Sequence, residues 1–86
     1  MAKKEFTSEE AAQIAGSLAI DLEAQGIELD QFRMGLGVEL EHGQVDRKTN
    51  VTHNDPILTG KIALAHLREI PDYYTRLAKM EAEAES

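Results

Sequence analysis

The sequence predicts an all-α fold, a small compact bundle of about four short helices. Apolar residues recur at helical spacing in several segments, and aromatic residues make up only 5% of the chain. A core of Leu, Ile, Val and Ala suits packed helices better than an aromatic-rich β-sandwich. Gly26, Gly43, Pro56 and Pro71 fall where such helices would begin or end. The expected helices cover roughly residues 8–25, 30–42, 55–70 and 72–84, with a polar loop at 43–54.

The first predicted helix follows Thr7 or Ser8, whose hydroxyl groups can accept hydrogen bonds from free backbone N–H groups. Gly26 is a natural residue to end this helix, because it adopts a left-handed conformation easily. Residues 1–6 are expected to form a frayed lead-in. One apolar stripe at helical spacing marks the buried face: Ala11, Ile14, Ala15, Leu18 and Leu22.

The second predicted helix begins near Asp30, and Gly43 is expected to stop it. It carries Gly35 and Gly37 in its interior, where each glycine costs about 1 kcal/mol relative to alanine. Such a cost is explained if another helix approaches closely there. A ligand that needs access to the backbone is the alternative explanation.

Asp55-Pro56 marks the start of the third helix, because aspartate caps helices and proline suits the first helical position. Pro71 ends that helix and opens the last one. In the last helix the spacing places three side chains on one face, and residues 82–86 are expected to fray. These side chains are Tyr73, Leu77 and Met80. All of residues 1–86 are expected to form one domain.

The composition limits the setting and the partners. Sixteen acidic residues against nine basic ones give a net charge of −7, which argues against direct nucleic-acid binding and against an anionic membrane surface. The chain has no cysteine, no apolar signal segment and no apolar run long enough to span a membrane. We expect a soluble cytoplasmic protein. Because a chain of this size buries a small core, a homodimer would enlarge it.

Two mirrored motifs, Glu39-x-x-His42 and His66-x-x-Glu69, carry the chemistry of this sequence. Helical spacing puts them on otherwise apolar faces, with Glu41 facing outward, so antiparallel packing would bring them together. Buried carboxylates and imidazoles need hydrogen-bond partners. The favoured interpretation is therefore a structural polar cluster that fixes helix register. Its expected members are Glu39, His42, His66, Glu69, Tyr73 and Tyr74.

The same four Glu and His side chains support an alternative, a metal site made of Glu39, His42, His66 and Glu69. These ligands suit Fe, Mn or Zn, and Glu-x-x-His is the spacing found in helical di-iron carboxylate proteins. One chain supplies too few ligands for that full pattern, and a homodimer would supply the rest. The cofactor is either one of these metals or none.

The segments that hold these residues resemble a known family. Val38-Glu39-Leu40-Glu41-His42-Gly43 and Ile62-Ala63-Leu64-Ala65-His66-Leu67-Arg68-Glu69-Ile70-Pro71-Asp72-Tyr73-Tyr74 belong to a match over most of residues 30–80. They resemble DUF5661, a family of short bacterial and phage-associated helical proteins classed as a domain of unknown function. The resemblance implies a small helical protein and implies no established activity.

The sequence contains no nucleophile elbow and no glycine-rich phosphate loop after a strand, so we identify no catalytic residues. We expect a non-enzymatic interaction or accessory module that binds a protein partner, with the Glu/His cluster inside it. Two alternatives stay open. One is a transition-metal-binding protein, and the other is an acidic nucleic-acid mimic that occupies a basic groove.

Overall fold

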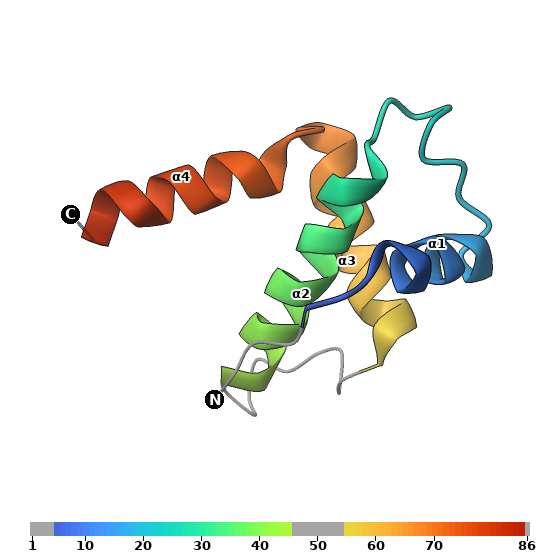
Figure 1. The fold of residues 1–86 in the computed structure, drawn as a ribbon, viewed down its shortest axis with the longest axis horizontal. Helices are drawn as coiled ribbons and strands as arrows, with labels where there is room; N and C mark the ends of the chain where they lie inside the picture. The colour runs from blue at the N-terminus through green and yellow to red at the C-terminus, as the bar shows by residue number, and fades with distance from the viewer. Residues whose placement is uncertain (1–4, 46–54, 86) are drawn as a thin grey trace.

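The computed structural model describes residues 5–45 and 55–85, in which the chain forms four α-helices (Figure 1). The all-α prediction is confirmed. Nine residues of the predicted polar loop, 46–54, lie outside the described residues. The four helices are α1 (Ser8–Ser17), α2 (Leu29–Val45), α3 (Pro56–Glu69) and α4 (Tyr73–Glu85).

Helices α2 and α3 lie side by side and run in opposite directions, and α1 packs against both (Figure 1). Helix α4 packs against α2, and its second half projects away from the other three helices. The bundle therefore consists of a three-helix body with one helix extending from it.

The core lies between α1, α2 and α3 and receives one aromatic ring from α4. Phe6 precedes α1 and is only 5% exposed, so the segment before the first helix supplies a core side chain. The buried apolar residues are Phe6, Ala11, Ile14, Ala15, Leu22, Ile27, Phe32, Leu36, Leu40, Ala63, Leu64, Leu67 and Tyr74.

Helix α1 ends at Ser17, not near residue 25, because the chain turns at Ala19. Ala19 adopts a left-handed φ of 56°, and its N–H donates to the Gly16 carbonyl. The N–H of Ile20 then reaches back to the Ala15 carbonyl. These paired hydrogen bonds end helices and usually need glycine at the left-handed position. Alanine gives no such signal in a sequence.

The sequence predicted that Gly26 ends the first helix, whereas in the structure it ends a separate short turn that follows α1. Its φ is 71°, and its N–H donates to the Glu23 carbonyl. The N–H of Ile27 reaches back to the Leu22 carbonyl, which repeats the pattern seen at the end of α1. Both Leu22 and Ile27 are buried, so the two reversals fold this connector onto the core.

The start of α3 follows the prediction, whereas the end of α2 does not. The Asp55 carboxylate accepts hydrogen bonds from the N–H groups of Ile57 at 2.8 Å and Leu58 at 3.4 Å. Helix α2, in contrast, continues through Gly43 to Val45. A glycine costs a helix only about 1 kcal/mol, so helical geometry can persist across it. Helix α4 also stays helical through Glu85.

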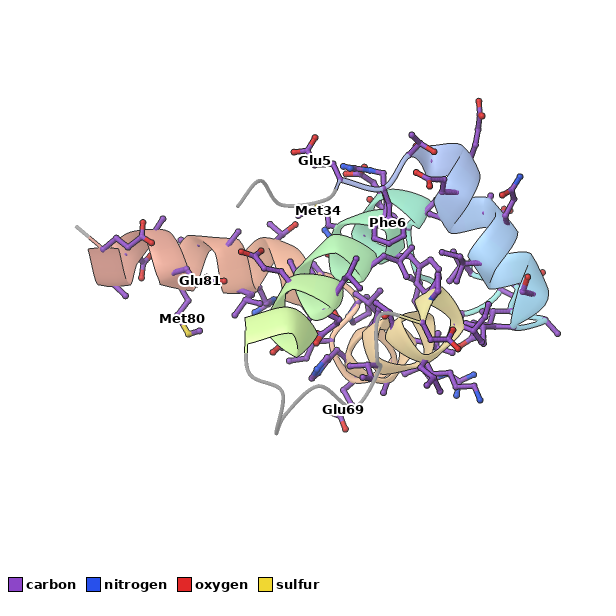
Figure 2. The ribbon with its side chains drawn as sticks, turned by 90° about the horizontal axis from the view of Figure 1, so that it is seen from below. Glu5, Phe6, Met34, Glu69, Met80 and Glu81 are labelled. Carbon is purple, nitrogen blue, oxygen red and sulfur yellow. The ribbon has the colours of Figure 1, made fainter. Side chains whose placement is uncertain are left out.

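The buried face of α4 differs from the predicted one. Tyr74 is 1% exposed, whereas Met80 is 59% exposed and points away from the helices (Figure 2). The Tyr74 ring lies directly on α2 at Gly35, where an added Cβ would come within 2.4 Å of Tyr74 Cε2. Close approach of another helix is therefore the reason for this glycine, as the sequence suggested.

Replacing Gly35 with alanine should destabilise the protein by about 1–3 kcal/mol, because the buried Tyr74 ring has to move. The free-energy cost of moving the ring should outweigh the roughly 1 kcal/mol by which a helix favours alanine over glycine. Gly16→Ala is the matched control, since an added Cβ there meets nothing within 4 Å and should stabilise the protein. Urea unfolding measures both, and stabilisation by Gly35→Ala would contradict the packing described.

Candidate functional site

The polar cluster forms around one carboxylate oxygen of α2. The Tyr74 hydroxyl donates a hydrogen bond of 2.8 Å to Glu39 Oε2. His66 Nε2, from α3, lies 3.4 Å from the same oxygen and forms an ion pair with it when the imidazole is protonated. One carboxylate thus joins α2, α3 and α4.

Aromatic stacking completes this cluster. The His66 ring stacks on Tyr73 with 4.4 Å between centroids and 3° between planes. Tyr73 in turn meets Tyr74 edge to face at 5.0 Å. The Glu39 side chain is 11% exposed and that of His66 is 39% exposed, so the cluster runs from the interior to the surface.

The surroundings of Tyr74 keep its hydroxyl group protonated. Burial, followed by the adjacent negative charge of Glu39 and the hydrogen bond to it, raises the pKa of the Tyr74 hydroxyl far above its usual value. The phenol therefore stays protonated under ordinary conditions and keeps its proton on the hydrogen bond to Glu39. This arrangement suits a fixed structural contact.

The structure brings together four of the six residues predicted for the cluster: Glu39, His66, Tyr73 and Tyr74. Glu69 is exposed and points away from the helices (Figure 2). The His42 side chain lies outside the described part of the chain. Among the side chains that the structure describes, no three His, Cys, Asp or Glu residues are grouped so that they could hold a metal ion. Of the four proposed metal ligands, the structure places Glu39 and His66 next to each other.

A second hydrogen bond fixes the start of α4. Gln31, nearly buried on α2, donates through Nε2 to Thr75 Oγ1. Thr75 and Tyr74 are adjacent on α4, while Gln31 and Glu39 lie on α2 roughly 12 Å apart along the helix axis. Two separated contacts on α2 therefore hold the first turn of α4 and set the direction in which that helix leaves the body.

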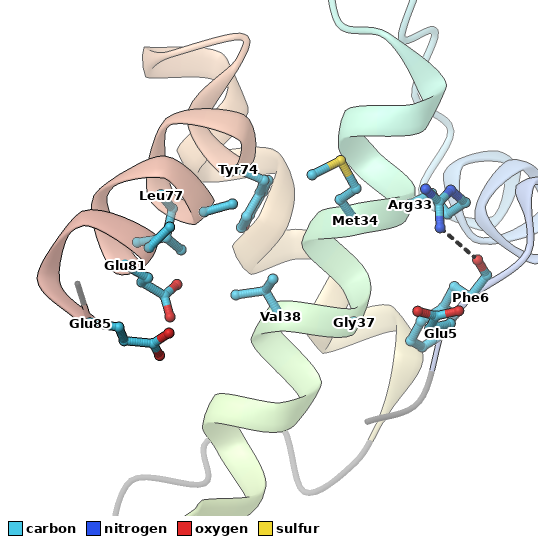
Figure 3. Close-up of a pocket in the computed structure, with 12 residues that line it drawn as sticks. Glu5, Phe6, Arg33, Met34, Gly37, Val38, Tyr74, Leu77, Glu81 and Glu85 are labelled. Atoms are coloured by element: carbon cyan, nitrogen blue, oxygen red, sulfur yellow. Dashed lines mark hydrogen bonds between the residues drawn. The ribbon is translucent and has the colours of Figure 1, made fainter. Parts of the chain in front are cut away.

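A groove of about 390 Å³ lies where α4 leaves the body (Figure 3). We call it the α2–α4 groove. Helix α2 forms its floor, α4 forms one wall, and the segment before α1 forms the other. Its lining residues are Glu5, Phe6, Arg33, Met34, Gly37, Val38, Tyr74, Leu77, Ala78, Glu81, Ala82 and Glu85.

The charges at the edge of the α2–α4 groove are mostly acidic. Glu81 and Glu85 lie one turn apart on α4, and Glu5 lies on the opposite wall. Arg33 is the basic residue of the lining, and it pairs with Asp30 at 2.8 Å. Arg33 also donates a hydrogen bond of 3.4 Å to the Phe6 carbonyl. Its charge is thus compensated by Asp30, and the groove edge carries excess negative charge.

The α2–α4 groove was not predicted from the sequence. Helical spacing puts Arg33 and Gly37 on the same face of α2 as Glu41, which was expected to face outward, and this face becomes part of the groove only because α4 extends past it. The available signal was a second apolar face on α4, formed by Tyr74, Leu77 and Ala78 at positions i, i+3 and i+4.

Most of the chain matches one known protein family. The profile of a family described as "Protein of unknown function (DUF5661)" matches residues 11–83. The chain belongs to the DUF5661 family. The DUF5661 match includes Glu39, His66 and Tyr74 of the cluster and Glu81 of the groove. No curated protein and no solved structure matches the chain significantly. Within residues 5–45 and 55–85, no helix has the length and apolar character needed to cross a bilayer.

Removing the Glu39 carboxylate should lower the free energy of unfolding by about 1–3 kcal/mol, because Glu39→Ala leaves the buried Tyr74 hydroxyl without its acceptor. His66→Ala should cost about 1 kcal/mol, because the partly exposed ion pair of His66 is weak and the Tyr73 ring loses its stacking partner. Glu69→Ala should change stability by less than about 0.5 kcal/mol. Urea unfolding of all three variants decides, and an unchanged midpoint for Glu39→Ala would contradict the cluster.

Stability should fall as the pH rises above about 10, the usual pKa of tyrosine. A hydroxyl whose pKa is raised by folding contributes stability that is complete below the unfolded pKa and is lost above it. The Tyr74 contribution to this loss should approach 1.4 kcal/mol per pH unit. Comparing thermal unfolding of wild type and Tyr74→Phe from pH 9 to 11 isolates this contribution, and parallel curves for the two proteins would refute it.

Proposed function

We propose that this protein is a non-enzymatic interaction module that binds a protein partner in the α2–α4 groove. The observation that carries this proposal is the groove itself, which two diverging helices line with half-buried apolar side chains. In the proposal, the Glu39–Tyr74–His66 contacts are structural and hold α4 at the angle that forms the groove.

The lining of the groove supports a binding role. Met34 and Val38 on α2 face Leu77 on α4, and all three are only partly buried (Figure 3). Methionine adapts its shape and is common on surfaces that bind peptides. The volume of about 390 Å³ lies within the range of clefts that bind ligands. A partly covered apolar groove is also a common site for a partner helix.

The chemistry of the cluster supports a structural role. Tyr74 cannot take up or release a proton near neutral pH, because its pKa is strongly raised. Glu39 Oε2 already accepts the Tyr74 hydrogen bond and faces His66. Metal binding at this oxygen would compete with both contacts, so the transition-metal alternative is less favoured than the interaction module.

Site-specific photo-crosslinking tests the interaction module. A photoreactive amino acid replaces Val38 in the groove in one variant, and Lys61, exposed on α3, in the control variant. In an extract of the cells in which the protein occurs naturally, the groove position should form discrete protein adducts that excess wild-type protein suppresses. Lys61 should form none of these adducts. Equal labelling from both positions, or adducts that wild-type protein does not suppress, would overturn the proposal.

A further inference from the structure

We propose that the α2–α4 groove takes a cationic amphipathic helix, with apolar side chains on the groove floor and Lys or Arg along both edges. This inference rests on the interaction module proposed above and specifies the chemistry of its partner. It is carried by the charges on the two walls and by the shape of the floor.

Negative charge lies on both walls of the groove. Glu81 and Glu85 follow the α4 wall at a spacing of one helical turn, and Glu5 lies across the floor from them (Figure 3). The one basic residue in the described lining, Arg33, already pairs with Asp30. A partner with basic residues on both sides of an apolar stripe would therefore meet opposite charge on both sides. The net charge of −7 would also attract such a partner over a distance.

The floor of the groove fits a helix. Gly37 lies beside Met34 and Val38 in the α2 part of the lining, and the α4 wall carries the small residues Ala78 and Ala82. Small side chains at these positions let a second backbone approach closely. The α4 wall extends from Tyr74 to Glu85, roughly 16 Å, or about three helical turns. Because the described residues form no strand, an extended peptide finds no sheet edge to pair with here.

A second copy of the chain fits this groove less well. The projecting end of its own helix α4 carries Glu81, Glu83 and Glu85, and its two basic residues, Arg76 and Lys79, lie nearer the body, so docking this end here would place acidic residues against acidic walls. Like charges facing each other across an interface disfavour a partner and guide selection toward one of opposite charge. The charge pattern therefore favours a basic helix over self-association.

Titration with two synthetic helical peptides tests the inference. Both peptides have about four turns and the same leucine stripe, flanked by lysine in one peptide and by glutamate in the other. NMR spectra of the ¹⁵N-labelled protein should show the lysine peptide shifting the backbone amides of Met34, Val38 and Leu77. The glutamate peptide should bind at least about tenfold more weakly, because each edge contact changes from attraction to repulsion.

A pair of double variants separates local from overall charge. Glu81→Lys with Glu85→Lys removes the acidic edge of α4, and Glu23→Lys with Glu69→Lys makes the same change in net charge at exposed positions outside the lining. The first variant should weaken binding of the lysine peptide about tenfold. The second should weaken it less than about twofold.

Three results would overturn the inference. They are equal binding of the two peptides, shifts that map outside the groove or do not occur, and equal weakening by the two double variants. Analytical ultracentrifugation of the free protein measures whether it self-associates. A dimer that dissociates on dilution with shifts at the groove amides would assign the groove to a second copy. The partner helix would then be wrong, whereas the crosslinking experiment decides separately whether the groove binds another protein.

Discussion

One aromatic side chain, Tyr74, sets the position of α4 on the rest of the protein. Its ring rests on the backbone of α2 at Gly35, where an added Cβ would force the ring to move, and its hydroxyl donates to Glu39 on the same helix. A buried hydroxyl needs an acceptor and a large buried ring needs a matching surface, so both requirements restrict where α4 can sit. The hydrogen bond from Gln31 to Thr75 restricts it further.

The groove is a consequence of this restriction. Tyr74 belongs to both sites, because its ring lines the α2–α4 groove while its hydroxyl lies in the polar cluster. The Glu and His residues that first suggested chemistry therefore act, in the function proposed here, by holding a binding surface in shape. In this proposal Glu39 and His66 would support binding without lining the groove themselves.

Much of the fold was predictable from local signals. Asp55-Pro56 opens α3, as its helix-start signal predicted, and Gly26 takes the left-handed conformation expected of it, although it ends a short turn and not α1. The predicted helix ends were wrong where the conformational preference of a single residue is weak or is overridden by the rest of the fold. Ala19 takes a left-handed conformation that alanine seldom adopts, and Gly43 stays helical within α2.

The candidate site was predictable only in part, and for a geometric reason. Opposing helical faces on antiparallel helices were enough to pair Glu39 with His66. The direction of α4, however, depends on contacts that the Tyr74 ring makes with α2, and spacing along α4 alone does not determine them. The buried face of α4 and the groove beside it follow from that direction, so neither was predicted.

The most direct test of this account is a distance measurement between the projecting helix and the body. Spin labels replace Lys79 on α4 and Lys61 on α3, both exposed, and pulsed electron paramagnetic resonance gives the distribution of distances between them. The wild-type protein and Tyr73→Ala should show one narrow distribution. Tyr74→Ala should broaden it while circular dichroism still shows a folded helical body. An equally narrow distribution in Tyr74→Ala would contradict the claim that Tyr74 positions α4.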